Sequence, residues 1–345
     1  MPRSLIAFIL AVVLILILTS WPFRGSDEGG TPLWLSTEIS SDSLKNEELG
    51  PALSMPCVSL FMDSSLYYEG WDTLLQPKFW QQIMQLPPDT VLVNIAKNRR
   101  IVDTLINDHP IFFNERLKKA YEDSTKRALG MKRREELFFT HGRSHFYQFA
   151  PILPDVDSAI KIFEDQGVDP WYAQAILLIE SPGHLQYSVD GAYGAFQLMK
   201  GVAREMGLKI NDQVDEREDF EKSAIAAAKL IDRVCLPHTR ELCRRYRLNY
   251  DEGEIWFRLL VMHVYHAGIG NVRRVVRKIR PKEGNRALIE KIWQTKSRRF
   301  GNASQNYTQI ALAAIMTAHD LMVDKNWACP EDSIKGKEGI YSVPF

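Results

Sequence analysis

The sequence has no excess of charge of either sign, because 43 lysine and arginine residues balance 43 aspartate and glutamate residues. A chain without a net charge has no long-range field with which to recruit nucleic acid or an anionic lipid surface. We therefore expect no nucleic-acid partner and a substrate that is recognised by shape and local contacts. The apolar fraction of 45% is ordinary for a globular chain of 345 residues with a sizeable core.

Cysteine is scarce, and the chain has only Cys57, Cys235, Cys243 and Cys329. This number fits an oxidising compartment outside the cytoplasm, but the count alone does not establish disulfides. One interpretation pairs Cys235 with Cys243 and Cys57 with Cys329. The other is that the cysteines are buried free thiols.

A metal-binding motif is also absent from the sequence. The cysteine spacing fits no zinc site, and His263 and His266 stand three residues apart without the glutamate of an H-E-x-x-H motif. We therefore expect neither a metal nor another cofactor.

One long apolar run stands at the N-terminus, where residues 4–23 carry no charge. At about 1.5 Å per residue, this segment reaches about 30 Å as a helix, which is enough to cross a bilayer. Small residues at the spacing of a signal-cleavage site are missing, so an uncleaved anchor is favoured over a signal peptide. Arg3 before the run predicts that the rest of the chain lies on the outer side of the membrane. We expect a protein of the cell envelope, exported to the periplasmic side.

Shifts in composition divide the chain into five parts. Residues 1–23 are the anchor or signal peptide, and residues 24–54 are rich in serine, glycine and acidic residues, which predicts a flexible linker. Residues 55–153 include KFWQQIMQL, NIAKNRRIVDTLI and FFNERLKKAYEDSTKRAL, whose helical spacing of apolar residues predicts a helical accessory region. Residues 154–330 form the main domain, and residues 331–345 form a C-terminal tail.

The main domain is predicted to be mostly α. We expect its helices over residues 158–166, 171–179, 200–206, 220–234, 239–247, 254–266, 286–293 and 304–323. Glycines gather in two clusters just beyond strongly apolar helices, at 183–194 and at 268–270. A backbone without side chains allows tight turns and the close approach of a ligand. Two such loops that face each other would form a cleft.

Glu180 ends the apolar stretch WYAQAILLIE. Partial desolvation raises the pKa of a carboxylic acid toward the range in which it serves as a general acid. This is the requirement for breaking a glycosidic bond. Ordinary glycoside hydrolysis uses two carboxylates about 5 to 9.5 Å apart, but no second acid obviously accompanies Glu180. Asp190 is the only acid in the motif that follows.

The motifs that accompany this acid are Glu180-Ser181, Ser188 with the following GAYG, Gln197-Leu198-Met199 and Tyr265-His266-Ala267-Gly268. In order and spacing they resemble the lytic transglycosylases of the soluble type and their membrane-bound D-like relatives. The resemblance implies a lysozyme-like α-helical catalytic domain over residues 154–330. The helical accessory region and the N-terminal transmembrane or signal helix that precede this domain are expected from the composition of the chain and not from the resemblance, which does not cover residues 1–100. The resemblance also implies cleavage of the β-1,4 bond between N-acetylmuramic acid and N-acetylglucosamine in peptidoglycan, with a 1,6-anhydro product. The partners would then be peptidoglycan glycan strands and, through the N-terminal helix, the membrane.

The resemblance assigns a role to each motif residue. Glu180 would protonate the glycosidic oxygen and then, as a carboxylate, take the proton of the attacking C6 hydroxyl. The acetamido group of the substrate would replace the second carboxylate. The substrate-binding residues would be Ser181, Ser188, Gln197, Met199, Tyr265, His266 and Tyr307. The ordinary alternatives are a turn residue for Ser188 and a solvated side chain for Gln197. For Met199 and Tyr265 the alternative is core packing.

Three departures from the family pattern bear on substrate placement. His266 replaces an asparagine, Ala303 replaces a glutamate that precedes the motif tyrosine Tyr307, and the loop from Glu180 to Ser188 is one residue shorter. An imidazole both donates and accepts hydrogen bonds, so His266 would replace the asparagine and add a titration near neutral pH. Two alternatives remain open, a goose-type lysozyme-like hydrolase and a catalytically weakened peptidoglycan-binding scaffold.

Overall fold

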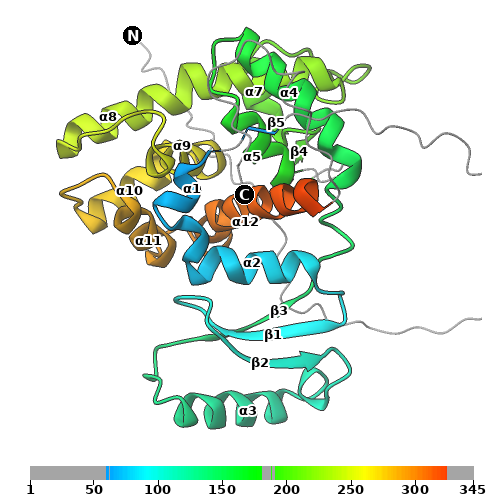
Figure 1. Cartoon of the computed structure of the whole chain (residues 1–345), viewed down its shortest axis with the longest axis vertical. Helices are drawn as coiled ribbons and strands as arrows, with labels where there is room; N and C mark the ends of the chain where they lie inside the picture. Colours follow the sequence, from blue (N-terminus) through cyan, green and yellow to red (C-terminus); the bar gives the residue numbers. More distant parts are fainter. Residues whose placement is uncertain (1–59, 62, 181–187, 189–190, 325–345) are drawn as a thin grey trace, which may run out of the picture.

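The structure is a computed structural model, and it describes residues 60–61, 63–180, 188 and 191–324. A large helical part and a smaller part with a sheet lie one above the other (Figure 1). The predicted anchor, linker and tail lie outside the described residues. In the part of the chain that is described, no helix has the length and apolar character that a membrane span requires.

Three antiparallel strands form the sheet, in the order β2-β1-β3: β1 (Thr90–Ile95), β2 (Ile101–Ile106) and β3 (Leu137–His141). Thr90 stands opposite Ile106 in the β1–β2 hairpin and Val91 stands opposite His141 of β3. The expectation of a helical accessory region over residues 55–153 is therefore wrong for this segment, because NIAKNRRIVDTLI contains the end of β1 and the whole of β2 and is not a helix.

The strands form because TVLVNI and IVDTLI are rich in β-branched residues, whose side chains pack well on a pleated surface. The period of two that usually marks a strand is missing because both faces of β1 are covered. Val91, Leu92 and Val93 are successive residues, and all three are buried. A strand covered on both faces reads as a continuous apolar run, which sequence periodicity does not distinguish from a buried helix.

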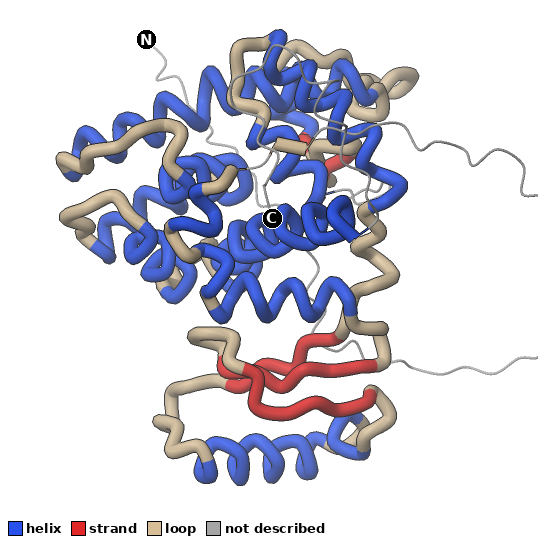
Figure 2. Tube along the Cα trace, in the orientation of Figure 1, coloured by secondary structure: helices blue, strands red, loops and turns tan. Residues whose placement is uncertain are grey.

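Helices cover the two faces of the sheet (Figure 2). The predicted helices in KFWQQIMQL and FFNERLKKAYEDSTKRAL are confirmed as α2 (Leu75–Gln85) and α3 (Glu115–Ala128), and a short α1 (Ser65–Tyr68) precedes them. α3 begins where it does because the Asn114 side chain accepts the backbone N–H groups of Arg116 and Leu117, at 2.9 and 3.2 Å. α2 lies between the sheet and the helical part (Figure 1).

All eight helices predicted in the main domain are confirmed, with ends that differ by a few residues. They are α4 (Leu153–Asp165), α5 (Trp171–Glu180), α6 (Lys200–Glu205), α7 (Phe220–Leu230), α8 (Leu236–Tyr246), α9 (Ile255–Ala267), α11 (Arg286–Gln294) and α12 (Asn302–Asp324). One π-helical turn (Ile231–Cys235) joins α7 to α8. A further helix, α10 (Ile269–Ile279), follows Gly268, and the short strands β4 (Ala192–Tyr193) and β5 (Leu198–Met199) form a hairpin.

Three helices at the centre of the domain position the motif residues. Every residue of α5 before Glu180 is buried, and every residue of α9 is buried. A helix that is apolar on all sides belongs inside a core. α12 packs against both, so Glu180 at the end of α5, Tyr265 near the end of α9 and Tyr307 near the start of α12 approach one another.

The pairing of Cys235 with Cys243 is wrong, because both are buried free thiols. They stand eight residues apart on one helical segment, which separates them by about 12 Å along its axis. A disulfide requires Cα atoms within about 7 Å. Cys57 and Cys329 lie outside the described residues.

Candidate active site

Glu180 is the last residue of α5 and keeps some exposure at the end of an otherwise buried helix. Its Oε1 atom is enclosed and has no hydrogen-bond partner of standard geometry among the described residues. Burial raises the pKa of the carboxyl to about 7, and the interaction with the Tyr307 hydroxyl lowers this pKa by a smaller amount. No carboxylate of the described residues is among the causes of this shift. A carboxyl with this pKa holds its proton for part of the time at neutral pH, as a general acid requires.

Three tyrosine hydroxyls surround this acid, and they belong to Tyr147, Tyr265 and Tyr307. Burial raises the pKa of each, and the negative charge of Glu180 raises it further. Tyr265 donates a hydrogen bond to the Phe196 carbonyl at 2.7 Å, so its hydroxyl is engaged. The Tyr307 hydroxyl is enclosed and has no partner of standard geometry among the described residues, and its effect on the Glu180 pKa places it next to this carboxyl.

His266 is buried beneath Tyr307. The two rings stack with centroids 4.1 Å apart and an interplanar angle of 21°, and His266 is 1% exposed. Burial lowers the pKa of His266 to about 3, so the expected titration near neutral pH is wrong. The imidazole is neutral and supports the Tyr307 ring instead of serving as a charged group in the cleft.

His263 stands one helical turn before His266 and is also buried. Its Nε2 atom lies 2.9 Å from the Thr308 hydroxyl. Within the described ranges no group of three histidine, cysteine, aspartate or glutamate side chains is arranged to hold a metal. This histidine therefore serves as a polar contact between α9 and α12.

His266→Asn is expected to make the protein less sensitive to acid. An imidazole with a lowered pKa in the folded state stabilises the fold above the unfolded pKa of about 6.5, and this stabilisation is lost as the pH falls. Between pH 7 and pH 5 the loss from one such group is about 2 kcal/mol. Urea unfolding of both proteins at the two pH values measures the difference. An equal loss in the variant and the parent would show that folding does not lower the pKa of His266.

The hairpin β4–β5 carries three further motif residues. The Ser188 hydroxyl accepts the N–H of Ala192 at 2.9 Å and closes the turn before β4, as a turn residue would. Gln197 is buried, has a φ of 47°, and donates from Nε2 to the Gly194 carbonyl at 3.0 Å. A left-handed conformation is uncommon for a glutamine, so the surrounding structure constrains this turn closely. Met199 ends β5 and is partly exposed.

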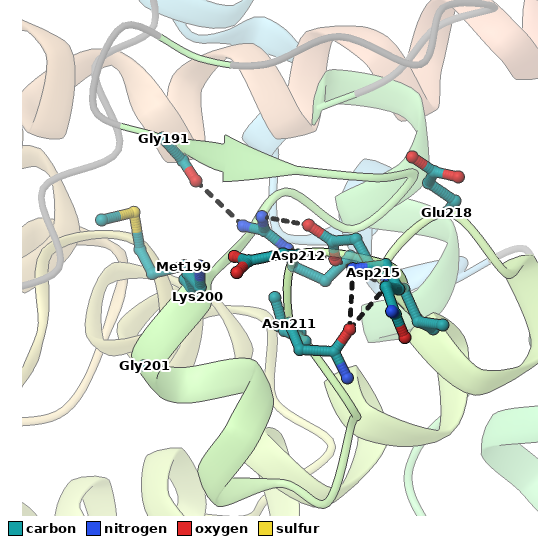
Figure 3. Close-up of a pocket in the computed structure, with 12 residues that line it drawn as sticks. Gly191, Met199, Lys200, Gly201, Asn211, Asp212, Asp215 and Glu218 are labelled. Carbon is teal, nitrogen blue, oxygen red and sulfur yellow. Dashed lines mark hydrogen bonds and ion pairs between the residues drawn. The ribbon is translucent and has the colours of Figure 1, made fainter.

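A cavity of about 620 Å³ opens beside this hairpin (Figure 3). Met199 and Lys200 lie on one side of it and Glu218 on the other. Arg217 forms an ion pair with Asp215 at 2.6 Å. It also donates to the Gly191 carbonyl just before β4 and to the Leu198 carbonyl in β5, both at 2.9 Å. The hairpin is thereby held as one wall of the cavity.

The structure brings the predicted residues together in two groups. Glu180, Tyr265, His266 and Tyr307 form one group, while Ser188, Gln197 and Met199 lie on the hairpin. The hydrogen bond from Tyr265 to Phe196 connects the two groups. Ser181 and Asp190 lie outside the described residues.

Comparison with known families finds a match for the central part of the chain. Residues 157–288 match the model of the Transglycosylase SLT domain. The SLT domain is a lytic transglycosylase domain of the lysozyme-like superfamily, and its activity is directed at peptidoglycan. No curated protein matches the chain.

The SLT match does not contain the whole group around Glu180. Tyr307 follows the matched residues, and Tyr147 precedes them. Sequence analysis missed Tyr147, although the aromatic cluster HFYQF just before the main domain was an available signal. The rings of Phe146 and Phe149 flank Tyr147, with centroids 4.9 and 5.9 Å from its own. Aromatic residues that are this dense at a domain boundary indicate packing against the domain.

Proposed function

We propose that the chain is an exported, membrane-anchored peptidoglycan lytic transglycosylase. It cleaves the β-1,4 bond between N-acetylmuramic acid and N-acetylglucosamine and leaves a 1,6-anhydromuramoyl end. The observation that carries the proposal is the enclosed Glu180 carboxyl, whose pKa is raised to about 7 and on which no carboxylate of the described residues acts. The SLT match supports the class of substrate.

In the proposed reaction one carboxyl serves two steps. Protonated Glu180 gives its proton to the glycosidic oxygen as the bond from this oxygen to the anomeric carbon breaks. The resulting carboxylate then takes the proton of the C6 hydroxyl as the C6 oxygen bonds to the same carbon. The acetamido group of the muramoyl residue stabilises the anomeric carbon between the steps. A pKa near 7 suits a group that must both give and take a proton at neutral pH.

The substrate-binding residues of the proposal are Ser181, Ser188, Gln197, Met199, Tyr265, His266 and Tyr307. Tyr307 is the best placed to act on the acid, because its hydroxyl faces the carboxyl and its effect on the Glu180 pKa favours the carboxylate. Tyr265 and His266 act through their neighbours, since one holds Phe196 and the other supports the Tyr307 ring. Met199 would contact the sugar from the end of β5. It also lines the cavity beside the hairpin, although Glu180 is not among the residues that line this cavity.

Kinship with the membrane-bound D-like transglycosylases and anchoring through residues 4–23 complete the proposal. Both rest on the sequence: on the motif register, and on an uncharged apolar run of sufficient length to cross a bilayer.

Digestion of purified peptidoglycan sacculi tests the reaction. We expect the soluble products, separated by chromatography and weighed by mass spectrometry, to carry 1,6-anhydromuramoyl ends. These ends are one water lighter than reducing ends. Reducing ends alone would indicate a goose-type lysozyme-like hydrolase. Sacculi that bind the protein and release nothing would indicate a scaffold.

A further inference from the structure

The first turns of α12 are held by two side chains from the part of the chain that contains the sheet. Arg99, in the turn between β1 and β2, donates from Nη2 to the Oδ1 atoms of Asn302 and Asn306, at 2.8 and 2.6 Å. Trp80 on α2 donates from Nε1 to Gln309 Oε1 at 3.1 Å. Asn306 and Gln309 stand on either side of Tyr307 in the chain, so the segment that carries this tyrosine is held from outside the SLT match.

Arg99 is an unusual residue for a hairpin turn. It is 4% exposed, and its φ of 61° lies in the left-handed region. No carboxylate of the described residues forms an ion pair with it. Amide oxygens and the faces of Phe79, Trp80 and Phe138, with centroids 5.0 to 5.7 Å away, stabilise the guanidinium instead.

Burying a charge without an anion and holding a long side chain in a left-handed turn are both unfavourable. Burial lowers the pKa of Arg99 to about 10, which reflects this cost. Attaching the hairpin to the domain needs no such arrangement, because apolar contacts between α2 and α12 already join the two parts. The hydrogen bonds of Arg99 instead fix the position of the first turns of α12.

The helix transmits this position to the catalytic group. Asn302 and Asn306 are four residues apart and share one face of α12. Tyr307 is the next residue, about 100° further around the axis, where it stacks on His266 and faces Glu180. The hydrogen bonds from Arg99 to Asn302 and Asn306 therefore fix the rotation of α12 about its axis, and this rotation sets the direction of the Tyr307 hydroxyl.

We infer that Arg99 is a positioning residue of the catalytic centre, through which the sheet region orients Tyr307 toward Glu180. The inference rests on the proposed function, since it assigns Arg99 to that same site. The sheet region is then a working part of the enzyme and more than a spacer before the SLT domain.

Arg99→Gln removes the two hydrogen bonds from Arg99 Nη2 to Asn302 and Asn306. We expect kcat to fall about tenfold with little change in KM, because small displacements of catalytic groups reduce the rate strongly. The pH profile should change as well. The Tyr307 hydroxyl favours the Glu180 carboxylate, so its displacement raises the Glu180 pKa. The acid form then persists to higher pH, and the alkaline limb of kcat moves upward. Tyr307→Phe should move the limb in the same direction.

The experiment measures anhydromuropeptide release from soluble glycan fragments between pH 5 and pH 9. The matched control is Arg100→Gln, an exposed arginine in the same turn. Arg99→Lys keeps the charge but loses the second guanidinium nitrogen, which binds Asn94, and the planar group that contacts the aromatic rings, so we expect partial rescue. In the double variant Arg99→Gln/Tyr307→Phe, the alkaline limb should move no further than in Tyr307→Phe alone. Both changes weaken the same interaction, the one between the Tyr307 hydroxyl and Glu180.

A second variant, Asn302→Ala, covers the case in which Arg99→Gln does not fold. It deletes one acceptor and leaves those of Asn94 and Asn306 in place. It should move the alkaline limb in the same direction by a smaller amount. Folded variants whose kcat and alkaline limb match those of Arg100→Gln would overturn the inference, as would additive shifts in the double variant. Failure of the proposed function is distinct, since the parent protein would then release no anhydro products.

Discussion

Replacing Glu180 by glutamine is expected to reduce anhydromuropeptide release on the order of 10³-fold, because the amide can neither give the first proton nor take the second. The parent protein should also lose activity above about pH 7, where the Glu180 carboxyl loses its proton. Chromatography of digested sacculi measures both effects. The matched control is Glu205→Gln, an exposed glutamate on α6, which should leave activity unchanged.

Stability measurements show whether the loss of activity is chemical. A carboxyl whose pKa is raised in the folded state favours the fold at low pH, and this stabilisation is lost as the pH rises through the folded value of about 7. Glu180→Gln does not titrate, so above pH 7 we expect it to be more stable than the parent, by up to about 3 kcal/mol. A stable Glu180→Gln protein that still clears cell-wall material would show that another group is the acid.

Arg258→Met is expected to lower the free energy of unfolding by about 3 to 5 kcal/mol, which is typical when one partner of a buried ion cluster is removed. Arg258 is buried on α9, where Nη1 binds Asp63 and Nε binds Asp169 at 2.7 Å. Its guanidinium also lies over the ring of Trp171, 5.7 Å from the centroid. Methionine would leave two carboxylates without their cation.

The control for this prediction is Arg273→Met, which removes a surface pair. Arg273 Nη2 lies 3.3 Å from Glu241 Oε2, and the two side chains are 41% and 46% exposed. Exposed pairs contribute less than about 1 kcal/mol. Urea unfolding of both variants at pH 7 measures the difference. Equal losses would mean that the Arg258 cluster is solvated and does not hold the core.

The Arg258 cluster also bears on the active site. Asp169 accepts the N–H of Trp171 at 3.0 Å, where α5 begins. The arginine therefore secures the start of the helix whose last residue is Glu180. Activity of Arg258→Met should fall in step with its folded fraction, since Arg258 belongs to the core and not to the acid's surroundings.

The helices of the main domain could be predicted from the sequence because their signals are local. α5 and α9 are apolar runs of ten and thirteen residues, which is longer than most buried strands, and glycines follow both runs in the sequence. α10 was not expected because Gly268 and Gly270 indicated a loop, yet Gly268 is a turn and Gly270 already lies within the helix.

The strands could not be predicted in the same way. Whether TVLVNI is a buried strand or a buried helix depends on what covers it, and α2 and α3 come from different parts of the sequence. The state of the thiols could not be predicted either. Cys235 and Cys243 are close in sequence, which suggested a disulfide, but the continuous helical segment that contains both keeps their sulfur atoms apart.

Motif register alone predicted Glu180 as the acid and Tyr265, His266 and Tyr307 as residues of the same site, because residue type and spacing are properties of the chain. The charge states of these groups follow from packing. Burial holds His266 neutral and raises the Glu180 pKa, and both effects require neighbours from several helices. The contributions of Tyr147 and Arg99 appear only in the folded molecule, since desolvation and contact arise between segments that are distant in sequence.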